Sequence, residues 1–557
     1  MIYPKKILAQ QVLYACQENE IINIVISPGS RNAPLTIGFL NNKKFKILSV
    51  VDERCAAFFA LGIAQQTKKP VALVCTSGSA LLNYYPAIAE AFFSNIPLII
   101  LSADRPKHLL NIGDGQTINQ NNVFANHILK SVNLVEDTSD LHQNLMIIDE
   151  TVKLAILQDG PVHINIPFDE PLYETTNKSI NFSKIEKVTL PTLLTEKPLE
   201  VTELENYAAI WNNAKKKMVL IGVNFPSELI QTQINHLLKD PSVLVLTETT
   251  SNVYHKNVIN GIDKLISPLS QSELKELQPG VLITFGGMIV SKKIKQFLRN
   301  HQPKQHWHVD KKTSLNTFHC LTYHFKVTAA LFFSQFFFLT KVKNSNYQQQ
   351  WLSIKEKREI KQDEFLVNTN FSDLKVFDIV LKSLPKNSLL QFANSSIIRY
   401  TQLFKLDKTQ QVFCNRGTSG IDGSTSTAIG ASFVSKKQTI FITGDISFFY
   451  DGNALWNKYI PSNFRVILIN NSGGGIFRFI PGPKSSNALE IFETPHNLNA
   501  SHLCKMFGFE YFKAKNQNDL ERNLKDFYNL SSQPKLLEIF TPKDVNDIIL
   551  KDYFKNL

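Results

Sequence analysis

The sequence predicts an α/β protein with three doubly wound domains, each built on a mainly parallel sheet that helices cover on both faces. Its 557 residues are too many for one hydrophobic core, so several domains are expected. Short apolar runs alternate with helix-length segments along the chain, as in parallel sheets. A stretch near the N-terminus also recurs near the C-terminus, which indicates that two of the domains are related.

The recurring stretch aligns without a gap. Residues 60–101 fall on residues 428–469 when the chain is shifted by 368 positions. Both copies read as helix, two lysines, apolar strand, small-residue turn, helix, Ser-Asn and apolar strand, so we interpret them as a duplication. The identical positions include Ala60 with Ala428, Gly62 with Gly430, Lys68-Lys69 with Lys436-Lys437, Ser94-Asn95 with Ser462-Asn463, and Ile99 with Ile467.

The strand-like runs divide the chain into four parts. We expect a first domain over residues 1–171, a polar, proline-containing linker over 172–200, a central domain over 201–340 and a last domain over 341–557. Strands are expected at 24–26, 71–74, 98–101 and 162–166 in the first domain and at 218–222, 243–246, 281–285 and 307–309 in the central one. Because Gly222, Gly286 and Gly287 do not form a dinucleotide fingerprint, we interpret the central domain as structural.

Composition and charge limit the class of protein. The net charge of +12 favours anionic partners, but the lysines are dispersed and no basic stripe with interleaved aromatics predicts nucleic-acid binding. The six cysteines are scattered, as expected in a reducing compartment. The N-terminus lacks a signal-peptide core, and the most apolar segment, 329–339, is shorter than the roughly 20 residues of a membrane span. The sequence therefore predicts a cytoplasmic protein without a transmembrane segment.

Two polar turns in the last domain predict a cation site. Gly444-Asp445-Ile446-Ser447 follows an apolar strand-like run, and Asn470-Asn471 follows the next such run. Side chains at the carboxyl ends of neighbouring parallel strands lie close together, and Mg²⁺ prefers their oxygen atoms together with phosphate oxygens. The helix after such a turn offers free N–H groups to a diphosphate.

The pair of turns resembles the signature of thiamine-diphosphate enzymes, in which Gly-Asp-x is followed after a helix-length spacer by Asn-Asn. The resemblance implies that Asp445, Asn471 and the carbonyl group of Gly473 bind Mg²⁺ or Mn²⁺. It also implies that the cofactor lies between the first, pyrimidine-binding domain and the last, diphosphate-binding domain. The residues expected to bind the cofactor are Glu53, Ile421, Gly444, Asp445, Ile446, Ser447, Asn471, Gly473, Gly474 and Ile476.

Two of these residues have special roles in such enzymes. Glu53 opens a predicted helix after an apolar run and is the candidate catalytic carboxyl, which would contact N1′ of the aminopyrimidine and promote loss of the C2 proton. The shift of 368 positions places Ile421 at the point equivalent to Glu53. A large aliphatic side chain holds the cofactor in a V shape in this class, so Ile421 is the candidate for that role.

Further segments narrow the resemblance to the 2-succinyl-5-enolpyruvyl-6-hydroxy-3-cyclohexene-1-carboxylate synthases of menaquinone biosynthesis. The most specific are Ser27-Pro28-Gly29-Ser30-Arg31 and Asn415-Arg416-Gly417-Thr418-Ser419-Gly420-Ile421-Asp422-Gly423. That family decarboxylates 2-oxoglutarate and adds the succinyl carbanion equivalent to isochorismate. The substrate-binding residues implied are Ser30, Arg31, Arg105, Gln116, Lys292, Ser395, Arg399, Arg416 and Phe477.

The charges agree with this assignment, because the two substrates bring four carboxylates and arginine binds carboxylate with two parallel hydrogen bonds. The family resemblance also implies a homodimer or a dimer of dimers. Three alternatives stay open at this point: a pyruvate-using decarboxylase or carboligase of the acetohydroxyacid synthase type, a catalytically inactive thiamine-binding scaffold, and a nucleic-acid binder.

Overall fold

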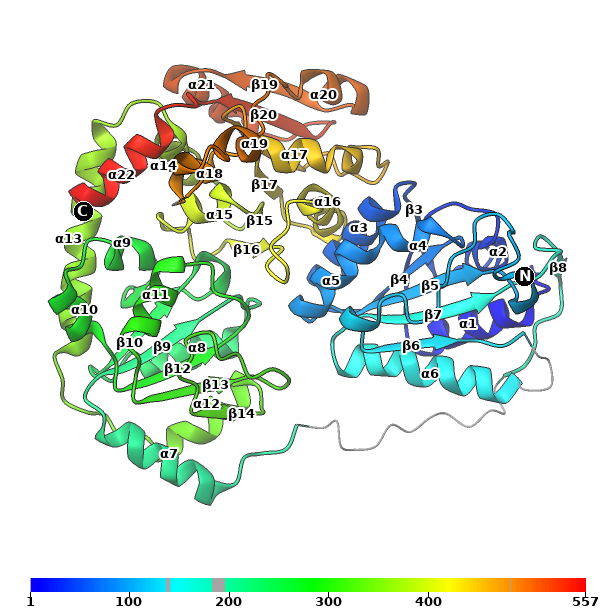
Figure 1. Cartoon of the computed structure of the whole chain (residues 1–557), viewed down its shortest axis with the longest axis horizontal. Coiled ribbons are helices and arrows are strands. Elements are labelled where there is room, and N and C mark those ends of the chain that lie inside the picture. Colours follow the sequence, from blue (N-terminus) through cyan, green and yellow to red (C-terminus); the bar gives the residue numbers. More distant parts are fainter. Residues whose placement is uncertain (1, 137–140, 183–195, 481) are drawn as a thin grey trace.

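The computed structural model describes residues 2–136, 141–182, 196–480 and 482–557 (Figure 1). Within them lie three six-stranded sheets in which every pair of neighbouring strands is parallel, and one two-stranded antiparallel ladder of β1 (Tyr3–Pro4) with β8 (Thr175–Thr176). The predicted α/β architecture of three parallel-sheet domains is confirmed. The boundaries at 171, 200 and 340 stay predictions, and residues 183–195 of the expected linker lie outside the described residues.

The first sheet has the strand order β3-β2-β4-β5-β7-β6 and is covered on both faces. Helices α1, α2 and α6 pack on one face, and α3 and α5 pack on the other. Its strands are β2 (Asn23–Ile26), β3 (Lys46–Ser49), β4 (Val71–Cys75), β5 (Leu98–Asp104), β6 (Lys130–Asn133) and β7 (Val162–Pro167). Its helices are α1 (Ile7–Glu18), α2 (Ala33–Leu40), α3 (Glu53–Thr67), α4 (Ser79–Asn83), α5 (Tyr85–Ser94) and α6 (Leu141–Leu157).

The last sheet has the order β16-β15-β17-β18-β20-β19, which in chain order is the same arrangement as in the first sheet. This shared topology supports the duplication inferred from the repeat. The strands are β15 (Leu389–Phe392), β16 (Gln411–Cys414), β17 (Thr439–Gly444), β18 (Arg465–Asn470), β19 (Glu510–Ala514) and β20 (Lys535–Phe540). The helices are α14 (Asp373–Ser383), α15 (Ser396–Thr401), α16 (Ser424–Val434), α17 (Asp445–Tyr450), α18 (Ile476–Phe479), α19 (Leu489–Glu493), α20 (Ser501–Phe507), α21 (Gln517–Phe527) and α22 (Asn546–Asn556).

The central sheet differs, with the order β11-β10-β9-β12-β13-β14 that dinucleotide-binding domains also use. Its strands are β9 (Lys217–Ile221), β10 (Val243–Thr247), β11 (Val258–Ile259), β12 (Val281–Phe285), β13 (Gln305–Val309) and β14 (Tyr323–Phe325). Its helices are α7 (Val201–Asn213), α8 (Glu228–Leu237), α9 (Ile262–Ile266), α10 (Gln271–Leu277), α11 (Lys292–Asn300) and α12 (Ala329–Phe336).

Packing accounts for the central glycines that the sequence left without a fingerprint. A side chain on Gly222 would meet the carbonyl oxygen of Gly287 at 2.0 Å, so these loops touch through their backbones. The buried carboxylate of Glu248 accepts hydrogen bonds from the backbone N–H groups of Val290 and Ser291, just before α11. The chain thus places its own anion beside the start of that helix, where an anionic ligand would otherwise be favoured.

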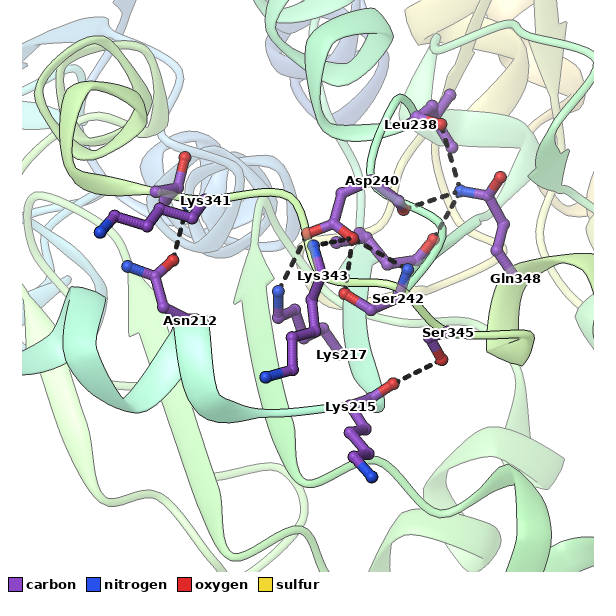
Figure 2. Close-up of polar contacts among 12 residues, drawn as sticks. Asn212, Lys215, Lys217, Leu238, Asp240, Ser242, Lys341, Lys343, Ser345 and Gln348 are labelled. Carbon is purple, nitrogen blue, oxygen red and sulfur yellow. Dashed lines mark hydrogen bonds and ion pairs between the residues drawn. The ribbon is translucent and has the colours of Figure 1, made fainter.

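A buried ion pair joins the central domain to the segment that leads into the last domain (Figure 2). Lys217 Nζ lies 2.9 Å from Asp240 Oδ2, and the lysine is fully buried. The other carboxylate oxygen of Asp240 accepts hydrogen bonds from Ser242 and from the backbone N–H group of Lys343. Helix α13 (Tyr347–Val367) starts just beyond Lys343 and runs from the central core to the last one (Figure 1). The pair therefore fixes where this connecting helix begins.

The apolar segment at 329–339 forms α12 and a following turn, with Phe332, Phe333 and Phe336 in the central core. Within the described ranges, no helix combines the length and the hydropathy that a membrane crossing requires.

The first and last domains meet through the equivalent helices of the two repeats, α3 and α16 (Figure 1). A Cβ atom on Gly62 would lie 2.1 Å from the carbonyl oxygen of Thr427, and one on Gly430 would lie 2.0 Å from that of Phe59. These two glycines occupy matching positions of the repeat, so the helices contact each other backbone to backbone about a local pseudo-twofold relation. On a neighbouring helix, the buried carboxylate of Glu90 accepts hydrogen bonds from the N–H groups of Gly417 and Thr418, both at 2.7 Å.

We predict that Gly62→Ala weakens the contact between α3 and α16, because the added methyl group meets backbone atoms that cannot rotate away. Overpacking of this kind costs about 1–3 kcal/mol of stability. The matched control is Gly452→Ala, since no atom lies within 4 Å of a Cβ atom there. Thermal melts of the two variants check the prediction, and equal melting temperatures would contradict it.

Candidate active site

The two polar turns identified in the sequence lie side by side. β17 and β18 are parallel neighbours, with Gly444 opposite Ile469, so both turns leave the same edge of the sheet. The backbone N–H group of Gly473 donates a 2.9 Å hydrogen bond to Asp445 Oδ2 and joins one turn to the other. Gly473 has a φ of +149°, and a side chain there would meet the carbonyl oxygen of Glu493 at 2.6 Å. Glycine is therefore required at this position for both reasons.

The donor set around these turns fits a hard divalent cation. Asp445 is buried, and its Oδ1 accepts a hydrogen bond from the N–H group of Ile446. The side-chain nitrogen of Asn471 is bonded to Asp373, which leaves its oxygen for a ligand. Carboxylate, amide and carbonyl oxygens are the groups that Mg²⁺ and Mn²⁺ bind beside phosphate. Among the described residues no group of three or more His, Cys, Asp or Glu is placed to hold a metal.

Two further residues surround this donor set and were not singled out from the sequence. Asp373 is buried and accepts hydrogen bonds from Asn471 at 2.9 Å and from Thr541 at 2.6 Å. Burial raises the pKa of Asp373 to about 6, hydrogen bonds from Thr541 and Asn471 oppose the shift, and the nearby Asp445 adds to it. His496 Nε2 lies 3.3 Å from Asp445 Oδ2. Neither residue belongs to a local motif, so only the folded chain identifies them.

Glu53 and Ile421 lie on facing segments of the two repeats. Glu53 is the first residue of α3, whose N-cap Asp52 accepts a hydrogen bond from the N–H group of Cys55. The neighbouring Arg54 donates a hydrogen bond to the carbonyl oxygen of Asp422, the residue after Ile421. Ser447 Oγ in turn donates to the Ile421 carbonyl oxygen at 3.0 Å. The structure thus links the start of α3, Ile421 and the turn after β17, while Glu53 itself is half-buried.

Arg54 also binds a buried acid of the last domain. Its guanidinium lies 3.4 Å from Asp451 Oδ1 and donates to the carbonyl oxygen of Tyr450 at 3.2 Å. Asp451 is fully buried and accepts hydrogen bonds from the N–H and hydroxyl groups of Ser426. Burial raises the pKa of Asp451 to about 7, against the effects of these hydrogen bonds and of Arg54. This pair fastens α3 beside the cation turns.

The candidate substrate arginines fall into two pairs. Arg31 is buried, donates to the carbonyl oxygen of Phe168 at 2.9 Å and lies 3.3 Å from Glu170. Arg105 pairs with Asp114 at 3.1 Å and donates to the Gly115 carbonyl oxygen. Both arginines follow strands of the first sheet and already have partners within the first domain.

Arg399 and Arg416 form the second pair, in the last domain. Arg399 donates to the carbonyl oxygen of Ser395, a residue with a φ of +67°, and Arg416 donates to Asn394. Burial lowers the pKa of Arg399, and the nearby Arg416 lowers it further. Burial also lowers the pKa of Lys295 in the central domain; its electrostatic neighbours include Glu248, Arg416 and Arg399. The central domain therefore contributes a cation beside this pair.

Most of the remaining candidates are exposed or partly exposed. Ser30, Gln116 and Lys292 are exposed. Ile476 and Phe477 are partly exposed at the start of α18, and the Phe477 ring lies 5.3 Å from that of Phe492. Gly474 donates its N–H group to the Glu493 carbonyl oxygen at 2.6 Å. Their roles toward substrate stay predictions.

Comparison with known proteins defines the class first. Three thiamine pyrophosphate enzyme models match the chain: the N-terminal TPP-binding domain at residues 7–126, the middle domain at 193–392 and the C-terminal TPP-binding domain at 395–539. The chain is a thiamine pyrophosphate enzyme, with the predicted cation turns inside the C-terminal match and Glu53 inside the N-terminal one.

Full-length relatives then define the family. The chain is 54% identical over 562 residues to a 2-succinyl-5-enolpyruvyl-6-hydroxy-3-cyclohexene-1-carboxylate synthase of Flavobacterium johnsoniae, and 55% identical over 559 residues to that of Flavobacterium psychrophilum. Both alignments cover all of each protein. The synthase of Porphyromonas gingivalis is 38% identical, over 96% of this chain and 94% of the relative. The chain belongs to this synthase family.

We predict that the stability of Asp451→Asn, measured relative to the parent at the same pH, increases as pH rises. Because the folded-state pKa of about 7 lies above the ordinary value of 3.8, protonation favours the folded chain. The stability that Asp451 contributes therefore falls as pH rises from about 4 to about 7. Melting temperatures of parent and variant at several pH values check this. A difference between them that does not change with pH would contradict the prediction.

Proposed function

We propose that this chain decarboxylates 2-oxoglutarate and adds the resulting succinyl group to isochorismate, giving 2-succinyl-5-enolpyruvyl-6-hydroxy-3-cyclohexene-1-carboxylate for menaquinone biosynthesis. The observation that carries the proposal is identity of 54% over the whole chain with a synthase of that name. The match to both TPP-binding domains supports thiamine diphosphate as the cofactor. The names of the relatives do not favour the pyruvate-using alternative.

The cofactor-binding roles proposed for this chain come from the family resemblance, and the geometry of the turns supports them. Asp445, Asn471 and the Gly473 carbonyl group would hold Mg²⁺ or Mn²⁺, and the adjoining residues Gly444, Ile446, Ser447, Gly474 and Ile476 would surround the diphosphate and thiazolium. Bound thiamine diphosphate supplies an electron sink for the carbanion left by loss of CO₂. Ile421, whose carbonyl oxygen accepts a hydrogen bond from Ser447, would support the cofactor.

Glu53 would hold a proton at the aminopyrimidine N1′ atom, because its position at the start of α3 faces the last domain through Arg54. Asn83 Nδ2 lies 3.5 Å from Glu53 Oε2 and is a neighbouring polar side chain. A carboxyl group in this place acts as a general acid and base toward the cofactor ring.

The substrates are dianions, and the proposed site offers cations for them. Arg399 and Arg416 follow the neighbouring strands β15 and β16 of the last sheet, with Lys295 near them. We assign carboxylate binding to this pair first, since Arg31 and Arg105 already have acidic partners. Arg31 and Arg105, with Ser30, Gln116, Lys292, Ser395 and Phe477, remain proposed substrate contacts.

A homodimer or a dimer of dimers is proposed from the family resemblance. Light scattering during turnover tests it, and an active monomer would contradict it. The cytoplasmic location also stays a prediction; it agrees with the six cysteines, all of which are free.

The proposed reaction is tested by CO₂ release from 2-oxoglutarate by the full-length protein with thiamine diphosphate and Mg²⁺. We expect strong stimulation by isochorismate, with consumption of both substrates, because the acceptor completes the cycle. If CO₂ release from 2-oxoglutarate does not change when isochorismate is added, isochorismate is not the acceptor. CO₂ release from pyruvate alone would favour the acetohydroxyacid synthase type.

We predict that Glu53→Gln keeps cofactor binding and lowers turnover by about 100-fold or more, as expected for loss of a general acid-base group. Quenching of intrinsic fluorescence by thiamine diphosphate measures binding, and CO₂ release measures turnover. Glu20→Gln is the control, because the Glu20 side chain is largely exposed. A near-parental rate for Glu53→Gln would remove Glu53 from this role.

A further inference from the structure

Asp373 is a buried residue whose carboxylate accepts a hydrogen bond from Asn471, one of the proposed cation ligands. It is the first residue of α14, 2% of it is exposed, and its Oδ2 accepts the 2.9 Å hydrogen bond from Asn471 Nδ2. Its other oxygen accepts from Thr541 at 2.6 Å, and its backbone N–H group donates to Asn546 at 2.8 Å. Two residues distant in sequence, Asn471 and Thr541, therefore hold this carboxylate in one orientation, and Asn546 holds its backbone.

The helix start does not need this side chain. Ser372 is the N-cap of α14, and its side chain accepts the hydrogen bond from the N–H group of Lys375. Within the described part of the chain no lysine or arginine forms an ion pair with Asp373. A buried carboxylate without a paired cation is costly, so its retention beside Asn471 and Asp445 calls for another reason.

That reason is the symmetry of the asparagine side chain. The oxygen and nitrogen of an amide have nearly the same shape, and a 180° turn of the Asn471 amide would present N–H₂ to a cation. An ionised carboxylate only accepts hydrogen bonds, so Asp373 can bond the amide nitrogen and not the amide oxygen. The orientation in which Asn471 Oδ1 is free for a metal is thereby selected.

We propose that Asp373 is a positioning residue for the divalent cation: it orients the amide of Asn471 and adds negative charge behind the site. This inference rests on the proposed cation site at Asp445 and Asn471. Residues that orient metal ligands through hydrogen bonds commonly change metal affinity by about 10- to 100-fold when removed.

The test is Mn²⁺ binding to the full-length protein with thiamine diphosphate and no substrate, with free Mn²⁺ followed by electron paramagnetic resonance. We expect Asp373→Ala to bind Mn²⁺ about 10- to 100-fold more weakly than the parent. The control is Asp378→Asn on the same helix. The Asp378 carboxylate lies 2.6 Å from Lys382 Nζ, and we expect this substitution to change the Mn²⁺ affinity by no more than about twofold. Circular dichroism confirms that each variant is folded.

A reciprocal exchange keeps the proposal testable if Asp373→Ala does not fold. In Asp373→Asn with Asn471→Asp, the amide donates to the carboxylate across the same contact, so side-chain volume and the hydrogen bond are retained. The comparison is Asn471→Asp with Asp373→Leu, which has the same charge and a side chain of similar size but no hydrogen-bond donor beside the carboxylate. We expect the reciprocal exchange to bind Mn²⁺ more tightly than this second double variant.

Mn²⁺ binding by Asn471→Ala distinguishes a failure of the Asp373 role from a failure of the cation site itself. If Asn471→Ala loses Mn²⁺ binding but Asp373→Ala does not, or if the reciprocal exchange binds no better than Asn471→Asp with Asp373→Leu, the role of Asp373 is overturned while the cation site stands. If Asn471→Ala binds Mn²⁺ like the parent, the cation site itself is wrong and the inference fails with it.

Discussion

The backbone contact between α3 and α16 is the constraint on which the rest of the candidate site depends. Gly62 and Gly430 occupy equivalent positions of the two repeats, and each faces a carbonyl oxygen of the other helix too closely for a side chain. This contact brings the start of α3, with Glu53, beside the segment that contains Ile421. Arg54 then bonds Asp422 and Asp451, so packing of small residues and a buried ion pair act at the same interface. A cofactor that bridges two domains needs such an interface to be reproducible, because it contacts both sides at once.

The positions of the two polar turns follow from the parallel sheet. Parallel strands deliver Asp445 and Asn471 to one sheet edge, and Gly473 joins the two turns because its backbone has no side chain to accommodate. Behind them, Asp373 connects Asn471 with Thr541 after β20 and with Asn546 at the start of α22. The positions of the candidate ligands therefore depend on elements close to 100 residues away in the sequence. The candidate ligands come from two short turns, but contacts with distant parts of the last domain hold them in position.

Local patterns in the sequence are sufficient to predict the fold class, the repeat and the meeting of the two polar turns at one sheet edge. Alternating apolar runs report parallel strands directly, and a Gly-Asp turn and an Asn-Asn turn need only their own strands to be recognised. Asp373, His496 and Arg54 could not be found in this way, because their partners lie far along the chain and their surroundings look like ordinary helix starts and loops. The same limit applies to the arginines. Arg31 and Arg105 match the family motifs, yet only the folded chain reveals their acidic partners Glu170 and Asp114.

We propose that the two repeats together form one cofactor site with the cation at Asp445 and Asn471. It is tested most directly by a crystal structure of the full-length protein grown with thiamine diphosphate and Mn²⁺, in which anomalous scattering locates the metal. We expect a Mn²⁺ peak in contact with Asp445, Asn471 and the Gly473 carbonyl oxygen, and a Glu53 side chain within hydrogen-bond reach of the aminopyrimidine ring. A peak held by other residues, or a pyrimidine ring remote from Glu53, would contradict it.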